Sequence, residues 1–296
     1  YDYQQFVTYT GKRSPFFTTV KMGADATGKL LAMETDWIVD HGAYSEFGDL
    51  LTHKGAQFIG AGYDIPSIRG TGRTVCTNHA WGAPYRGYGA PESEFASECL
   101  IDELAEKVGM DPLELRYKNV YRPGATTPTG QTPETFSLEA MIDIMRPKYK
   151  AAKEKATKES TPDKKKGVGV SIGIYGAGGD GPDTAEAWIE LLPDGNYLLS
   201  TTWSDHGQGA DAGALGCAHE ALRPLGVRPE QIRLELNDTA KAPDGGPAGG
   251  SRSQVIIGNA IKIACENMLA AMIQACGKYM NYDEMVSKEL PTRYSG

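Results

Sequence analysis

Apolar and polar residues alternate in two stretches, and each stretch predicts a β-hairpin. In residues 16–40 the alternation continues on both sides of a turn at 25–28, and residues 185–203 repeat this arrangement around a turn at 193–196. Each second strand ends in a tryptophan that is followed, after one or two residues, by Asp-His-Gly. This similarity indicates a weak internal repeat of one α+β unit, although chance also produces such an echo.

A helical period governs several other stretches. Apolar residues recur every four positions over 92–109, with Pro91 suited to the first turn and Gly109 to the end. Asp111 is a suitable N-cap for a second short helix. We predict further helices over residues 137–158, 211–223 and 255–277, and an apolar strand over 168–174. Strands and helices do not alternate regularly, so we predict an α+β fold of two domains, each a mixed sheet with packed helices, and no Rossmann domain.

The domain boundary is expected in a lysine-rich stretch that ends at Lys166. Residues 122–135 are rich in Thr, Pro and Gly and predict an ordered surface loop, after which the 137–158 helix leads into the lysines. We therefore predict a first domain over residues 1–146, a linker over 147–166 and a second domain over 167–296.

Charge and cysteine content narrow the choice of partner. A formal net charge of −8 argues against nucleic acid or an anionic membrane as the main partner. No run of about 18 apolar residues is present, so we expect no membrane-spanning segment. The five cysteines contain no C-x-x-C pair, which argues against a zinc site or a disulfide framework and suits a reducing cytoplasm. The chain opens at Tyr1 without an initiator Met, and we interpret it as a piece of a longer protein.

Three glycine-rich turns, at residues 85–91, 205–211 and 249–254, each come directly before a predicted helix. A helix start offers unpaired backbone N–H groups and the positive end of the helix dipole, and glycine lets an anion approach that backbone closely. One such turn is weak support for a binding site. Three in one chain predict a large phosphate-bearing or oxyanionic cofactor held from several sides.

Each turn also has a simpler interpretation. Arg86 alone is compatible with an ordinary surface arginine, His206 alone with a hydrogen-bonded core histidine, and the third turn with a plain helix cap. Set against this, each turn combines several donors, such as the two hydroxyls, the guanidinium and the amide of residues 251–254. Neither a P-loop nor a G-x-S-x-G elbow is present, so nucleotide hydrolysis and the usual hydrolase chemistry have no support.

The turns also carry a family resemblance. Residues 68–73, residues 86–91 with Glu94, and the stretches 109–116, 205–211 and 249–254 resemble, in chain order, the molybdenum-binding subunit of the xanthine oxidase family. Within that family they are similar to the bacterial molybdenum aldehyde oxidoreductases. The resemblance covers nearly the whole chain.

The resemblance implies a molybdenum hydroxylase that converts an aldehyde and water into a carboxylic acid. In the family, molybdopterin cytosine dinucleotide holds the molybdenum through its dithiolene, and no side chain of the protein binds the metal. The positions that match the family's cofactor loops are Arg86, Gly87, Tyr88, His206, Gly207, Gln208, Gly209, Ala210, Asp211, Ser251, Arg252, Ser253 and Gln254.

The resemblance also implies a substrate channel. Phe47, Leu50 and Tyr88 match its aromatic and apolar walls, and a leucine common there is matched by Gly178 or Gly179, which is expected to widen it.

Several parts of the family's machinery are expected outside this chain. The general base of the family is a glutamate in a Gly-Glu context, and this sequence contains no Gly-Glu pair, so we assign no catalytic residue here. The [2Fe-2S] domains that pass electrons to the acceptor are expected before residue 1. The parent is expected to be a homodimer, and this piece alone is expected to be inactive.

Two alternatives remain open. One is a purine hydroxylase of the same family, although an arginine of the purine enzymes is matched here by Lys54. The other is a non-catalytic domain that binds a nucleotide or another anion. A carbon monoxide dehydrogenase is disfavoured because Gly87 stands where those enzymes have a cysteine.

Overall fold

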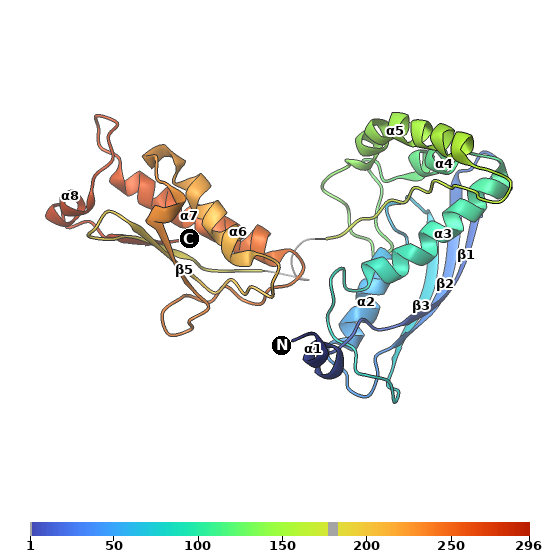
Figure 1. Ribbon diagram of the computed structural model, residues 1–296, viewed down its shortest axis with the longest axis horizontal. Helices are drawn as coiled ribbons and strands as arrows, with labels where there is room; N and C mark the ends of the chain where they lie inside the picture. Colours follow the sequence, from blue (N-terminus) through green and yellow to red (C-terminus); the bar gives the residue numbers. More distant parts are fainter. Residues whose placement is uncertain (1, 177–182) are drawn as a thin grey trace. The chain divides into compact units, whose positions relative to one another are not determined.

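The computed structural model describes residues 2–176 and 183–296, which fall into two compact units, Tyr1–Tyr175 and Gly176–Gly296 (Figure 1). This division lies later in the chain than the linker expected at 147–166. The reason is that Val168, Val170 and Ile172 still pack on the core of the first unit. The predicted strand over 168–174 is wrong: the segment pairs with no other strand of the described chain.

The first unit is built on a three-stranded mixed sheet in the order β1-β2-β3. The predicted hairpin is confirmed, with β1 and β2 antiparallel and Thr18 opposite Trp37. Strand β3 runs parallel to β2 and places Gly72 opposite Trp37, where a side chain would collide with the indole. The strands are β1 Phe16–Ala24, β2 Leu30–Asp40 and β3 Ser67–Val75.

Helices α2 and α3 pack against this sheet (Figure 1). The long helix predicted over 92–109 is confirmed as α3, which begins after Gly89 and ends at Gly109, both with positive φ. Asp111 caps α4 by accepting a hydrogen bond from the Leu113 N–H at 2.9 Å, as predicted. The helices are α1 Tyr3–Tyr9, α2 Gly48–Phe58, α3 Ala90–Val108, α4 Pro112–Asn119 and α5 Leu138–Glu159.

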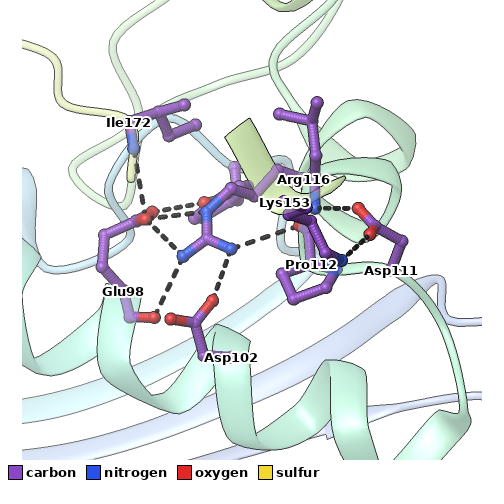
Figure 2. Close-up of polar contacts among 9 residues, drawn as sticks. Glu98, Asp102, Asp111, Pro112, Arg116, Lys153 and Ile172 are labelled. Carbon is purple, nitrogen blue, oxygen red and sulfur yellow. Dashed lines mark hydrogen bonds and ion pairs between the residues drawn. The ribbon is translucent and has the colours of Figure 1, made fainter. Parts of the chain in front are cut away.

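A buried ion pair joins α3 to α4 (Figure 2). Arg116 is fully buried, and its Nη2 lies 2.7 Å from Oε2 of Glu98 while its Nη1 lies 2.6 Å from Oδ1 of Asp102. The Tyr63 hydroxyl also donates to Glu98. A buried guanidinium requires such partners. The stretch at 109–116 therefore holds the first unit together.

The second unit has a four-stranded sheet in the order β6-β5-β4-β7, with α6 and α7 packed against it (Figure 1). The predicted hairpin of β4 and β5 and the helices near 211–223 and 255–277 are confirmed. The strands are β4 Trp188–Leu191, β5 Tyr197–Thr201, β6 Ile232–Leu236 and β7 Arg293–Ser295. The helices are α6 Ala210–Ala221, the π-helix η3 Ser253–Ile257, α7 Gly258–Met272 and α8 Tyr282–Ser287, with short 3-10 turns η1 Arg223–Leu225 and η2 Pro229–Gln231.

The two units share one chain order: an antiparallel hairpin, a helix, a strand parallel to the second hairpin strand, and another helix. Their Asp-His-Gly turns differ in environment. His41 is fully buried, with Nδ1 2.8 Å from the Ser14 hydroxyl, whereas His206 is exposed. The fold is α+β with mixed sheets, as the sequence predicts.

The span Ser253–Met272 is long and apolar enough, by length and composition, to cross a membrane. Its apolar face supplies Ile261, Cys265, Met268 and Met272 to the core of the second unit, all of them almost fully buried. This packing accounts for the hydropathy of the helix.

Candidate functional site

The turn at 85–91 uses three of its backbone N–H groups in hydrogen bonds within the chain. The N–H of Tyr88 donates to the Tyr85 carbonyl at 2.8 Å, and the N–H of Ala90 donates to the Gly87 carbonyl at 3.0 Å. The N–H of Gly89 donates to Oε2 of Glu92 at 3.1 Å, so Glu92 occupies the donor that this glycine offers at the start of the helix. The Arg86 side chain is exposed and is the main ligand donor that this turn offers.

The glycines of this turn answer a backbone requirement. Gly87 and Gly89 have φ of +88° and +90°. A side chain at Gly87 would collide with the Pro91 ring, and one at Gly89 would press on the backbone of α2. These positive φ values favour glycine. The turn is thus a tight platform that presents Arg86 at the start of α3.

Phe47, Leu50 and Tyr88, the expected channel residues, gather around the start of α2. The Tyr88 hydroxyl donates to the Phe47 carbonyl at 2.5 Å, and Leu50 lies in the first turn of the same helix. Phe47 is 60% exposed and Leu50 is 38% exposed. Both Phe47 and Tyr88 have positive φ, an uncommon state for bulky residues that is often found at functional sites. Gly178 and Gly179 lie outside the described residues.

The Tyr88 phenol stays protonated at neutral pH. Burial raises its pKa to about 12, and the nearby carboxylates of Asp49 and Glu46 add to the rise. A neutral phenol donates one hydrogen bond, and here the Phe47 carbonyl accepts it. Tyr88 therefore fixes the loop before α2 and presents its ring as an apolar wall.

The turn at 205–211 forms a nest of backbone N–H groups around its own Asp205 carboxylate. Gly207 N and Gly209 N donate to Oδ1 of Asp205 at 2.7 and 3.2 Å, and Asp211 N donates to Oδ2 at 3.3 Å. These bonds, with that of Asp211 first, lower the pKa of Asp205. The Asp205 carboxylate therefore occupies these N–H groups and fixes the shape of the turn.

The side chains of this turn differ in what they leave for a ligand. Gln208 spends its amide inside the turn, because Nε2 donates to the Ser204 carbonyl at 3.1 Å and Oε1 accepts from the His206 N–H at 2.5 Å. His206 itself is exposed, and so is Asp211 in the first turn of α6. No side chain occupies the space over Gly207 and Gly209, since a Cβ there would meet nothing within 4 Å.

In the turn at 249–254, Arg252 points inward. Its Nε lies 2.5 Å from Oδ1 of Asp183, and its other nitrogens donate to the carbonyls of Gly245 and Thr184. The residue is 6% exposed. Arg252 thus fixes the loop, while Ser251 and Gln254 remain exposed and Ser253 is half-buried.

The third turn lies against α6, the helix that follows the second turn. Gln254 Nε2 lies 3.5 Å from the Cys217 sulfur of α6, and a Cβ built on Gly213 would be 3.6 Å from Gln254 Oε1. Ser251 has φ of +61°, and a π-helix begins at Ser253, an irregularity that often accompanies function. The candidate residues therefore form two groups, one in each unit.

Residues outside the expected set also take part in these groups. Asp205 organises the second nest, and the pattern Asp-x-Gly-x-Gly before a helix is the sequence signal that points to it. Glu94 of α3 accepts a hydrogen bond from the Ile174 N–H at 2.9 Å, which joins two segments far apart in the chain. No local pattern in the sequence announces that contact.

The residues fit a phosphate-bearing pterin cofactor. Asp205 occupies the N–H groups of the second turn, but open space lies over Gly207 and Gly209, and Ser251 and Gln254 present exposed polar groups of the kind that bind phosphate and pterin edges. Among residues 2–176 and 183–296, no group of three His, Cys, Asp or Glu side chains is placed to bind a metal ion.

Models of the molybdopterin cofactor-binding domain match residues 1–120 and residues 144–289. Together the two models cover most of the chain. The chain therefore belongs to the molybdopterin cofactor-binding domain family, as the resemblance predicts. Aldehyde oxidoreductase of Megalodesulfovibrio gigas is 64% identical over 296 residues, all of this chain and 33% of that protein. The xanthine dehydrogenase/oxidase of Mus musculus is 28% identical over 281 residues, 90% of this chain and 20% of that protein.

Solved structures give the same picture. The aldehyde oxidoreductase from Desulfovibrio gigas superposes with a TM-score of 0.96 and 64% identity, and the enzyme from Desulfovibrio desulfuricans with 0.95 and 62%; each match covers all of this chain and 33% of the other. The chain thus spans about a third of the length of these relatives. Quinoline 2-oxidoreductase from Pseudomonas putida shares the fold at 22% identity, with a TM-score of 0.80 over 96% of this chain and 42% of that one.

Proposed function

We propose that the chain is the molybdopterin-binding part of an enzyme that oxidises aldehydes to carboxylic acids, with water as the oxygen source. The observation that carries the proposal is the 64% identity to an aldehyde oxidoreductase across every residue of the chain. The cofactor proposed is molybdopterin cytosine dinucleotide. When bound, it supplies the two-electron redox chemistry of the reaction.

Each turn has its own task in this proposal. Arg86, with Gly87 and Tyr88, faces the molybdenum end, where an exposed guanidinium suits an oxyanion. The nest from His206 to Asp211 and the loop from Ser251 to Gln254 hold the pterin and its phosphates. Arg252 acts there by fixing the loop, because its guanidinium is used internally.

Phe47, Leu50 and Tyr88 are proposed to guide the aldehyde. Their apolar surfaces exclude water beside the reacting carbon, and the hydrogen bond from Tyr88 to Phe47 holds two of these walls together. Precise placement of a substrate contributes to rate because it removes motion that a free encounter leaves open. This chain is assigned binding and orientation, and no proton transfer.

The remaining functions belong to the parent protein in this proposal. They are the glutamate that accepts the proton, the [2Fe-2S] clusters, the contact with an electron acceptor, and the homodimer interface. We propose a cytoplasmic location for the parent.

Native purification of the full-length protein tests the proposal. Metal analysis, fluorescence of the oxidised pterin after denaturation, and release of cytidine monophosphate on acid hydrolysis report on the cofactor. Steady-state rates with an aldehyde and with xanthine report on the substrate. Molybdenum, pterin, cytidine monophosphate and faster aldehyde turnover are expected. Xanthine as the better substrate would favour the purine hydroxylase, and absence of both metal and pterin would leave only an anion-binding domain.

A further inference from the structure

Two carboxylates of α3 hold the extended segment that leads out of the first unit. Oε2 of Glu98 accepts a hydrogen bond from the Ile172 N–H at 3.1 Å (Figure 2), and Oε1 of Glu94 accepts one from the Ile174 N–H at 2.9 Å. We name these two contacts the carboxylate clamp. It holds a segment that has no strand partner of its own in the described chain.

The spacing of the clamp follows from elementary geometry. Residues four apart in an α-helix lie about 6 Å apart along its axis, and residues two apart in an extended chain lie about 6.6 Å apart. Glu94 and Glu98 therefore match Ile172 and Ile174 in register. The two isoleucine side chains also rest against Gly62, where a Cβ would come within 3.3 Å of both.

The two glutamates differ in what else they do. Glu98 is also bound to the buried Arg116 and to the Tyr63 hydroxyl, so it belongs to the core of the first unit. Glu94 is half-buried, and burial raises its pKa to about 7, with the charge of Glu98 adding to the rise. The bond to Ile174 is the contact that the structure gives to the Glu94 carboxylate.

The residue after Ile174 is Tyr175, whose ring contacts α2, the helix that carries Leu50 of the candidate channel. The Tyr175 ring stacks on Phe58 of α2, with ring centroids 5.3 Å apart and planes 16° apart. Tyr175 is 43% exposed. The turn at 85–91 packs on the same helix, since a Cβ at Gly89 would lie 3.0 Å from the Gly55 nitrogen and 3.1 Å from the Leu51 carbonyl oxygen. The first turn of the same α2 carries Leu50.

We propose that Glu94 is a positioning residue of the substrate channel, because it fixes Ile174 and thereby holds Tyr175 against Phe58 of α2, the helix that carries Leu50 and against which the turn at 85–91 packs. The channel itself rests on the proposed function. The held ring narrows the approach to the channel along α2. Loss of the clamp frees Tyr175 and changes selectivity between small and bulky aldehydes more than it changes the turnover number.

Three variants and one control test the clamp without any cofactor. Glu94→Leu removes the acceptor, Glu94→Gln keeps a carbonyl acceptor of the same shape, and Ile174→Pro removes the donor. Glu103→Leu removes an exposed carboxylate from the same helix. In this chain, the Ile174 amide of Glu94→Leu is expected to exchange with deuterium roughly tenfold faster, as the loss of one hydrogen bond allows. Glu94→Gln and Glu103→Leu are expected to match the original chain.

Nitration of Tyr175 with tetranitromethane, measured by mass spectrometry, reports on the ring itself. Faster nitration in both Glu94→Leu and Ile174→Pro supports the proposal. Unchanged exchange of the Ile174 amide in Glu94→Leu, or unchanged nitration in both variants, overturns it. In the cofactor-loaded full-length enzyme, Glu94→Leu is expected to change KM for benzaldehyde more than KM for acetaldehyde, with kcat little altered. Glu94→Gln is expected to keep the original KM values.

The two failures are distinguishable. If Glu94→Leu frees Tyr175 but changes KM equally for both aldehydes, the channel role of Glu94 is overturned. An original enzyme with no aldehyde activity would remove the proposed function, and the exchange and nitration results alone would then decide whether Glu94 positions Tyr175.

Discussion

Arg252 Nε lies 2.5 Å from Asp183 Oδ1, so a residue that sequence reasoning places at a cofactor forms a nearly buried ion pair. The side chains of Arg252 and Asp183 are 8% and 18% exposed. The same guanidinium also donates to the carbonyls of Gly245 and Thr184. The loop at 249–254 therefore depends on this arginine for its shape before any ligand is considered.

Arg252→Met is expected to lower the free energy of unfolding of the second unit by about 3 kcal/mol, because it leaves a buried carboxylate and buried carbonyls without their donor. Urea denaturation followed by tryptophan fluorescence measures this change. Arg228→Met, which alters an exposed arginine of the same unit, is the control and is expected to be nearly neutral. Equal losses in the two variants would contradict the role assigned to Arg252.

Asp205→Asn is expected to destabilise the second unit at neutral pH and not in strong acid. The backbone N–H groups of the nest hold the Asp205 pKa below its ordinary 3.8, so the stabilisation is present above that value. It is lost as the pH falls through the lower pKa of the folded state, because the carboxylate must then be protonated. Melting temperatures of the original chain and of Asp205→Asn should therefore converge as the pH falls below 3.8. Asp163→Asn is an exposed control that should show no such convergence.

Glu94 makes the stability of the folded chain depend on pH in the opposite direction to Asp205. Burial raises its pKa from 4.5 to about 7 in the folded chain, so the folded state binds more protons than the unfolded state between these values. The free energy of unfolding therefore falls as the pH rises through this window.

Glu94→Gln removes this fall and keeps the acceptor for Ile174. At pH 8 it is expected to be more stable than the original chain by about 1 kcal/mol, once the partial exposure of the carboxyl is allowed for. The advantage should shrink towards pH 5. Urea denaturation at both pH values checks this, and an equal pH slope in both proteins would contradict it.

Replacement by alanine is expected to change stability in opposite directions at Gly209, the N-cap of α6, and at Gly216 inside the helix. Gly209 has φ of +86° at the start of the helix, so Gly209→Ala is expected to cost about 1 kcal/mol in stability. Gly216 lies inside the helix with open space around its Cβ position, so Gly216→Ala is expected to stabilise by up to about 1 kcal/mol. Thermal denaturation of both variants measures the difference. A loss in both would indicate that the helix is crowded at Gly216.

Local patterns in the sequence predict the hairpins and the long helices because alternation and capping act between near neighbours. Strands β3 and β6 were not predicted, since each pairs in parallel with a strand reached through a helix. Residues 168–174 look like a strand, but Ile172 and Ile174 give their N–H groups to side chains of α3. A run of apolar residues does not reveal whether its partner is a strand or a helix.

The sequence also predicts only part of the candidate site. The glycine pattern predicts where helices begin with free space for a ligand, as at Gly207 and Gly209. It does not reveal that Arg252 turns inward, because that depends on Asp183, distant in the chain. Molybdenum itself was predicted from the family resemblance alone, since the residues indicate only an anion.

The repeated order of hairpin, helix and parallel strand contains two Asp-His-Gly turns, and the fold depends on the histidine in only one of them among the described residues. His41 is fixed by Ser14 and by the backbone of Glu46, so substitution there damages the first unit itself. His206 stands exposed on a loop whose shape is maintained by Asp205 instead. Substitution at position 206 is therefore expected to spare the fold of the second unit, whereas substitution at position 41 is expected to destabilise the first.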